Sequence, residues 1–184
     1  RVGALAGQKQ RTKFAEVVRL QPKIAEGHEA LGAVLMELGK PLEAAKEFEA
    51  AEKIKPDDDG IETNLALAYV QANQPNLAIP HFASALSLSQ QPGHAALDAS
   101  FYDAYAHALA AAGKPDQAAL QLIAEESRSG PRADLEDAIG TLEAQQEKWH
   151  EAQRRFEHAI ALDGSFVRAR IHLGMLFRVQ KEMT

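Results

Sequence analysis

The 184-residue sequence contains no cysteine, and this absence removes several kinds of chemistry at once. Without thiols the chain cannot form disulfides, zinc–thiolate sites or a cysteine nucleophile. No segment approaches the ~18 consecutive apolar residues of a membrane span, so we expect no membrane insertion. With 46% hydrophobic and 25% charged residues, the composition is typical of an ordinary soluble protein, and it does not distinguish a cytoplasmic protein from an exported one.

Motifs of common catalytic sites are also missing. His28 and His150 each precede a glutamate, as in the metalloprotease motif His-Glu-x-x-His, but Gly32 and Arg154 occupy the position of the second histidine. The sequence contains no phosphate-binding glycine loop and no Gly-x-Ser-x-Gly nucleophile elbow. We therefore expect no catalytic residue, no metal site and no cofactor, and we do not expect an enzyme.

The chain has little positive charge for a nucleic-acid-binding protein. Its 20 basic and 26 acidic residues give a net charge of −6. A groove poor in Lys and Arg would repel phosphates, so we expect no nucleic-acid partner.

What the sequence does contain is a repeat. Four alanines mark it at separations of 34, 40 and 34 residues: Ala44, Ala78, Ala118 and Ala152. A second column of small residues accompanies them: Gly32, Ala66, Ala106, Gly140 and Gly174. Small side chains allow two helix backbones to approach closely, and a fixed period of this length is typical of a solenoid.

The first repeat resembles the tetratricopeptide repeat (TPR). It carries Leu31-Gly32, Ala44, Phe48 and Pro56 at the family's spacing, with His28 in place of the family's Trp. The resemblance implies an all-α fold, a right-handed α-α superhelix (a TPR solenoid) of antiparallel helix pairs. We expect a single array from 1 to 184, made of a half-unit at 8–22, units at 25–58, 59–92, 93–131 and 132–165, and a half-unit at 166–184.

Two features depart from the regular pattern. Six extra residues follow Ser89, and we expect them to lengthen the next helix, over Ala95–Ala112, with a longer loop before it as the open alternative. Glu125 and Glu143 occupy columns that are apolar in the other units, so each must stay hydrated or find a partner. We therefore expect the junction between the third and fourth units to be the loosest.

The TPR resemblance also implies a concave groove lined by the first helix of each unit. The residues that we assign to it are Glu26, Glu29, Ala33, Met36, Asn64, Leu67, Gln71, Asp103, His107, Asp137, Thr141, Arg168, His172, Met175 and Arg178. We expect Glu29, Asp103 and Asp137 to be exposed charges, and His107 and His172 to be ordinary polar lining rather than a metal pair. The expected partner is a protein or peptide that is apolar and carries basic residues.

We thus expect a protein–protein interaction scaffold that docks a peptide or protein segment in its groove. Two alternatives remain open. Because the chain begins and ends within a repeat, we expect it to be a piece of a longer protein, and its exposed ends could drive self-association into a structural array. It could also be the recognition arm of an enzyme whose catalytic domain lies outside this segment.

Overall fold

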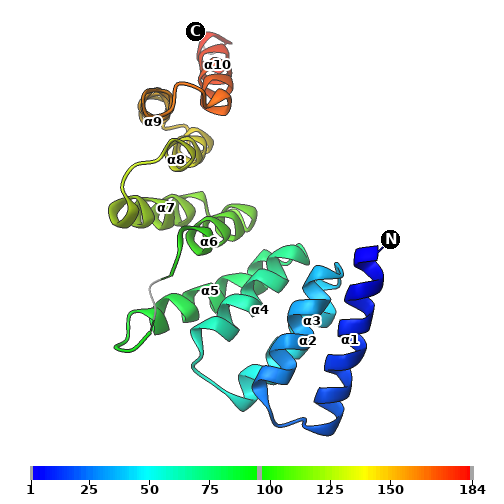
Figure 1. Ribbon diagram of the computed structural model, residues 1–184. Helices are drawn as coiled ribbons and strands as arrows, with labels where there is room; N and C mark the ends of the chain where they lie inside the picture. Colours follow the sequence, from blue (N-terminus) through cyan, green and yellow to red (C-terminus); the bar gives the residue numbers. More distant parts are fainter. Residues whose placement is uncertain (1, 95–96, 183–184) are drawn as a thin grey trace. The chain divides into compact units, whose positions relative to one another are not determined.

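The structure, a computed structural model, describes residues 2–94 and 97–182, with the side chains of residues 2–6 and 99 left undescribed. Within these ranges it has ten helices and no strand, so the predicted all-α fold is confirmed (Figure 1). The helices are α1 (Val2–Leu20), α2 (Ala25–Glu37), α3 (Pro41–Ile54), α4 (Asp59–Gln71), α5 (Pro75–Ser89), α6 (Ala99–Ala111), α7 (Pro115–Ser129), α8 (Ala133–Gln145), α9 (Trp149–Leu162) and α10 (Val167–Glu182).

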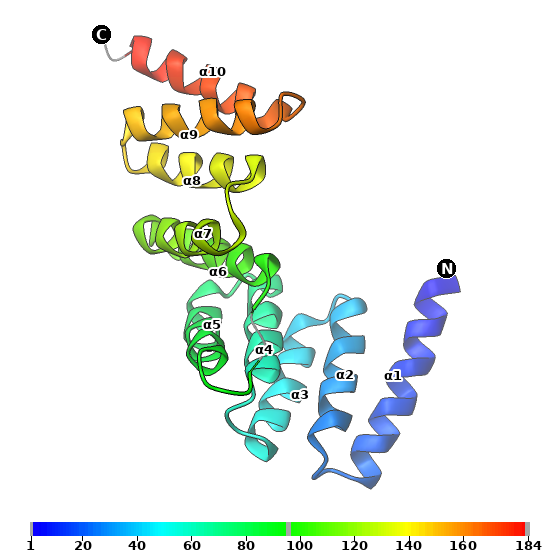
Figure 2. The same cartoon turned by 60° about the vertical axis from the view of Figure 1, so that its left-hand side comes forward.

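The chain divides into two compact units, Arg1–Leu97 and Asp98–Thr184. In the first unit α2 pairs with α3 and α4 with α5, while α1 packs on α2. In the second unit α6 pairs with α7 and α8 with α9, while α10 packs on α9 and α8. Figure 2 shows the partners of each pair side by side. These four pairs are called here the first to fourth repeats, and each consists of a first helix and a second helix.

The turns within the four repeats share one backbone shape. Each contains a residue with positive φ: Gly39 at 70°, Asn73 at 56°, Gly113 at 74° and Glu147 at 60°. In the first three turns a proline then begins the second helix, where its missing N–H is not needed. The fourth turn keeps the same shape with Glu147 and Trp149, although a left-handed glutamate costs roughly 1–2 kcal/mol.

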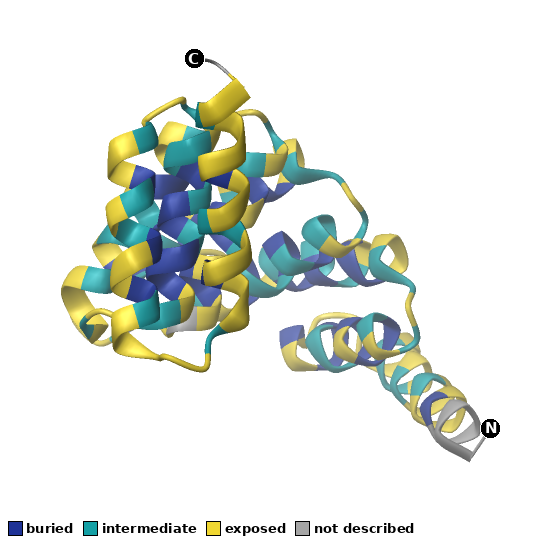
Figure 3. Cartoon of the chain, turned by 90° about the horizontal axis from the view of Figure 1, so that it is seen from above, coloured by how far each residue is buried: buried dark blue, intermediate teal, exposed yellow. Residues whose placement is uncertain are grey.

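Small residues and aromatic rings meet where the two helices of a repeat cross. The four alanines that mark the repeats are completely buried, and Figure 3 shows buried positions along the facing sides of the helices. A Cβ added to Gly32 would lie 2.6 Å from the ring of Phe48, and one added to Gly140 would lie 2.8 Å from the ring of Phe156. These glycines are therefore required by the packing, as the columns predict.

The prediction that the six extra residues lengthen a first helix is wrong. α6 has 13 residues, as do α2, α4 and α8. One extra residue extends α5, and the others lengthen the segment between Ser89 and Ala99. The start of α6 is fixed by Asp98, whose carboxylate accepts a hydrogen bond from the Phe101 N–H at 3.1 Å, as expected of an N-cap. Ala95, where we expected the helix to begin, lies outside the described residues.

Candidate binding groove and charged pairs

The second unit contains a cavity of about 590 Å³ between its first helices. Six of the predicted groove residues line it: Asp103 and His107 from α6, Asp137 and Thr141 from α8, and Arg168 and His172 from α10. Because these helices occupy equivalent places in consecutive repeats, residues 31 to 35 positions apart meet at one surface. This cavity is therefore the candidate binding groove of the second unit.

Asp137 is not the exposed charge that we expected. It is only 1% exposed, and its carboxylate accepts hydrogen bonds from Arg168 Nε at 2.6 Å and His172 Nδ1 at 2.7 Å. The pattern of α8 alone does not reveal this burial, because it is α10 that packs on α8 and covers Asp137. A buried carboxylate needs such partners.

Asp103, by contrast, is an exposed acidic side chain of this groove. Partial burial raises its pKa, and the nearby carboxylates of Asp134 and Glu125 act in the same direction, whereas Arg132 and Arg168 oppose them. Asp134 itself forms an ion pair with Arg132 at 3.1 Å. The exposed carboxylate of Asp103 is thus available at the mouth of the cavity, with nearby charges of both signs.

A second, apolar cavity of about 280 Å³ adjoins the groove and shares Thr141, Gln145 and His172 with it. Its apolar lining is Ala144, Trp149, Phe156, Met175, Leu176 and Val179. Trp149 packs against the buried cluster of Ala152, Phe156 and Leu176. Met175 remains 53% exposed. This cavity offers a site for an apolar side chain beside the acidic mouth.

In the first unit, the predicted groove residues lie on α2 and α4. Glu26, Ala33 and Gln71 are exposed, whereas Glu29, Met36, Asn64 and Leu67 are half-buried. Met36 packs against the hydrophobic core of α2, α3 and α4, so part of its side chain contributes to core packing rather than to the groove surface. Partial burial raises the pKa of Glu29, and Asp58 adds to the effect. In the second unit, Arg178 is exposed and lies outside the lining of both cavities.

A set of charged pairs, not predicted from the sequence, joins the two helices of a repeat. His28 bonds Glu47 at 2.8 Å, Glu62 bonds His81 at 2.7 Å, and Glu136 bonds Arg155 at 2.9 Å. In each pair the two residues are 19 positions apart. The signal was present in the sequence as an acidic and a basic side chain at this fixed spacing, with His28 already noted in place of an aromatic residue.

In the fourth repeat a carboxylate from the preceding second helix joins the pair. Arg155 donates to Glu126 at 2.9 and 3.0 Å as well as to Glu136. Burial raises the pKa of Glu126, and the neighbouring Glu136 adds to this effect. Burial would also raise the pKa of Glu136, but hydrogen bonds with Arg155, Glu126 and His158 lower it overall. The guanidinium thus lies between two carboxylates.

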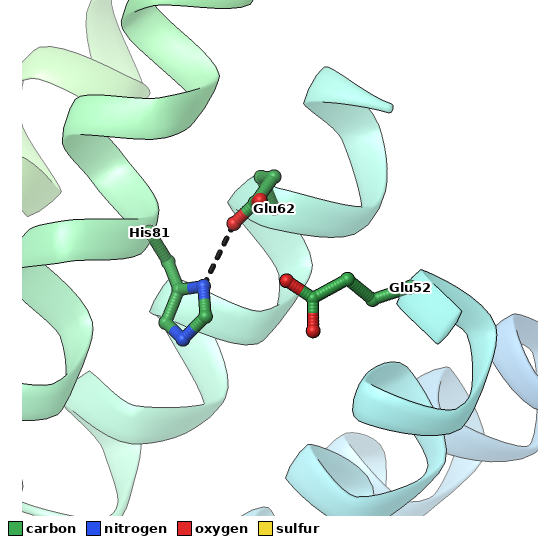
Figure 4. A group of neighbouring side chains, drawn as sticks. All are labelled: Glu52, Glu62 and His81. Atoms are coloured by element: carbon green, nitrogen blue, oxygen red, sulfur yellow. Dashed lines mark hydrogen bonds and ion pairs between the residues drawn. The ribbon is translucent and has the colours of Figure 1, made fainter. Parts of the chain in front are cut away.

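The second repeat has the corresponding arrangement with a different central residue. Glu52 and Glu62 occupy the repeat positions of Glu126 and Glu136, and His81 occupies that of Arg155. One ligand atom from each of the three lies within 4.8 Å of the others, and Figure 4 shows the three side chains pointing toward one another. The described residues contain no second group of this kind, and His107 and His172 are not part of it.

A family model described as tetratricopeptide repeat matches residues 11–59 and 138–184, just over half of the chain. The chain belongs to the TPR family. Its fold is also that of solved TPR proteins, all at low sequence identity. No curated protein sequence matches the chain significantly.

The structural matches cover most of this TPR chain. YrrB, described as a TPR protein with an unusual peptide-binding site, aligns with a TM-score of 0.79 at 20% identity over 93% of this chain and 85% of its own. MamA from Desulfovibrio magneticus RS-1 aligns with a TM-score of 0.74 at 18% identity, over 86% and 85%. A thermophilic TPR protein of Thermus thermophilus aligns with a TM-score of 0.59 at 16% identity, over 91% and 88%.

Family membership supports a general role as a protein-interaction scaffold, because TPR proteins bind protein or peptide partners and are generally non-catalytic. Among the described helices, none is both long and apolar enough to cross a membrane.

The two glutamates that depart from the TPR pattern have different surroundings. Glu125, only 3% exposed, pairs with Arg128 at 3.3 Å and Arg132 at 3.8 Å, so this buried charge has found partners. Burial raises the pKa of Glu143, whose Oε1 lies 3.8 Å from Arg155. Its Oε2 is buried with no hydrogen-bond partner among the described residues. Glu143 is therefore less favourable for the stability of the fold than Glu125.

Proposed function

We propose that this TPR chain docks a segment of a partner protein in the groove of its second unit. The observation that carries the proposal is the convergence of six predicted groove residues, from three helices, on one cavity of about 590 Å³. Ligand sites are typically concave, with a few polar groups beside apolar lining. The peptide-binding description of YrrB supports the same kind of function, without identifying a ligand for this chain.

The lining of the groove favours a partner segment with a basic residue next to an apolar one. Asp103 is exposed at the mouth, so it is available to a Lys or Arg of the partner. The adjoining apolar cavity accommodates an aliphatic or aromatic side chain against Trp149 and Met175. Asp137 contributes no free charge because Arg168 and His172 already bind it.

Selection of peptides from a displayed random library on the full chain tests this function. We expect enriched peptides to share a basic residue near an apolar one, and Asp103→Lys to weaken their binding at least tenfold. Glu157→Lys is the matched control, because it makes the same charge change at an exposed position on α9 outside the lining of both cavities. Equal binding by wild type and Asp103→Lys would contradict the proposed groove.

The exposed side of α10 favours a second candidate function, assembly through the end of the array. Ile171, Met175 and Phe177 are 50%, 53% and 46% exposed. A Cβ added to Gly174 would meet nothing within 4 Å, in contrast to Gly140. Exposed apolar surface of this kind is typical of interaction sites. A mass that increases with protein concentration, and that returns to the monomer in Phe177→Glu, would support assembly.

A further inference from the structure

The proposed peptide docking does not involve one group of potential metal ligands, which is formed by Glu52, Glu62 and His81. The three residues come from α3, α4 and α5, all within the first unit. We propose that they bind one divalent transition-metal ion, for which zinc is the test ion. This site is separate from the proposed groove of the second unit, so either proposal can fail without the other.

The distances suit a single ion after small side-chain rotations. The ligand atoms lie within 4.8 Å of one another. Zinc binds imidazole nitrogen and carboxylate oxygen at about 2.0–2.2 Å, which places two ligand atoms of a tetrahedral site roughly 3.3 Å apart. His81 Nδ1 now donates to Glu62 Oε2 at 2.7 Å. Zinc would take the place of the Nδ1 proton in this contact, and the neutral ring would then carry its single proton on Nε2, after exchange with water.

A second observation within the same chain shows that this repeat position holds a cation. In the fourth repeat, Arg155 lies between Glu126 and Glu136 and donates hydrogen bonds to both. The second repeat keeps both carboxylates at the corresponding positions but has the shorter imidazole of His81 in place of the guanidinium. The space and negative charge that accommodate a guanidinium are thus available to a metal ion that the imidazole can also ligate.

Neighbouring side chains hold two of the three ligands in place. Ser84 Oγ donates to Glu62 Oε1 at 3.1 Å, leaving Oε2 to face the imidazole. The ring of His81 stacks on Tyr69, with the centroids 5.8 Å apart and an interplanar angle of 19°. Tyr69 is held in turn by a hydrogen bond of 2.6 Å from its hydroxyl to Glu49. Such contacts to ligating residues orient them and increase metal affinity.

Burial and ligand type indicate which ions fit. Glu62 is 8% exposed, whereas Glu52 and His81 are half-buried, so an ion can enter from the surface. Three protein ligands leave a fourth coordination position for water. The imidazole favours zinc and its transition-metal neighbours over Mg²⁺ and Ca²⁺, which prefer all-oxygen sites.

Isothermal titration of the full chain with Zn²⁺ tests the site, and Co²⁺ absorption reports the coordination geometry. We expect saturable binding of one zinc ion that is weakened at least tenfold in both His81→Arg and Glu52→Gln. His81→Arg reproduces the arrangement of the fourth repeat, so we expect it to stay folded without metal. Glu47→Gln is the matched control: it alters the His28–Glu47 pair, where Val18 occupies the repeat position of Glu52.

Three results would overturn the proposal. The first is the absence of saturable zinc binding to the wild-type chain. The second is binding that survives either His81→Arg or Glu52→Gln, since the ion would then not be held by all three ligands. The third is an equal loss of binding in Glu47→Gln, which would indicate general adsorption to His–carboxylate pairs. Circular dichroism of each variant establishes that it is folded before it is compared.

Discussion

Arg168 donates a hydrogen bond to Asp137 across 2.6 Å and thereby links α10 to the bottom of the second unit's groove. Asp137 is almost fully buried, whereas Arg168 is largely exposed. The contact therefore helps to hold the last helix in place, and it also pairs the carboxylate of Asp137 in the groove. Asp137 and Asp103 look alike in the sequence, but this contact distinguishes them. Asp137 is buried and paired, whereas Asp103 is exposed.

Replacing Asp137 by Asn should destabilise the chain by about 1–3 kcal/mol, because hydrogen bonds that involve a charged group contribute roughly this amount. Asp103→Asn, on the exposed side of the same groove, should stay within ~0.5 kcal/mol of wild type. Urea denaturation followed by circular dichroism measures both. Equal stability of the two variants would mean that Asp137 is not held as the structure shows.

Gly140→Ala and Gly174→Ala should have opposite effects on stability, although both residues occupy the same repeat position. The new Cβ at 140 would lie 2.8 Å from the Phe156 ring, whereas the one at 174 would meet nothing within 4 Å. Overpacking typically costs about 1–3 kcal/mol, and an uncrowded Gly→Ala change within a helix gains roughly 0.5–1 kcal/mol. Thermal denaturation of both variants measures the difference, and a gain at position 140 would contradict the observed packing.

Arg155→Met should destabilise the second unit by at least ~2 kcal/mol, because it leaves Glu126 and Glu136 facing each other without their shared cation. Arg154→Met is the matched control, since this neighbouring side chain is exposed. Chemical denaturation at neutral pH compares them. If Arg155→Met were as stable as Arg154→Met, the ion pairs would contribute nothing to the fold.

Glu143→Leu should stabilise the chain by about 0.5–2 kcal/mol at neutral pH, because it removes a buried carboxylate and restores the residue type of Leu35. Burial raises the folded-state pKa of Glu143 above its ordinary value of 4.5. The folded chain therefore binds this proton more tightly than the unfolded chain, and the ionised carboxylate destabilises the fold at all pH values above the folded-state pKa.

The advantage of Glu143→Leu should then diminish as the pH falls through the raised pKa toward 4.5, where Glu143 becomes protonated in both states. Denaturation curves of wild type and variant, taken across this range, measure the change. An advantage independent of pH would assign the gain to apolar packing alone.

The sequence predicts those parts of the structure that depend on local pattern. The small-residue columns of Gly32 and Ala44 identify the helix pairs, because close packing allows few alternatives at these positions. The start of α6 was not predicted correctly, since a helical pattern continues upstream of the N-cap Asp98. The burial of Asp137 depends on contact with Arg168, 31 residues away on another helix, which periodicity alone does not reveal.

The charged pairs are an intermediate case. Their spacing of 19 residues was visible in Glu62 and His81, but the approach of Glu52 depends on how consecutive repeats stack. Repeat architecture converts such a spacing into contact between neighbouring helices. Comparison of the second and fourth repeats at the same positions is therefore more informative than either repeat alone.

The most direct test of the proposed function is to map a selected peptide onto the chain by backbone NMR chemical shifts. We expect saturating peptide to shift the amides around His107, Thr141 and His172, on the three helices of the second unit's groove. Amides around Glu157, on α9, should not move. Shifts concentrated on α7 and α9, with none on α6 and α8, would contradict docking in this groove.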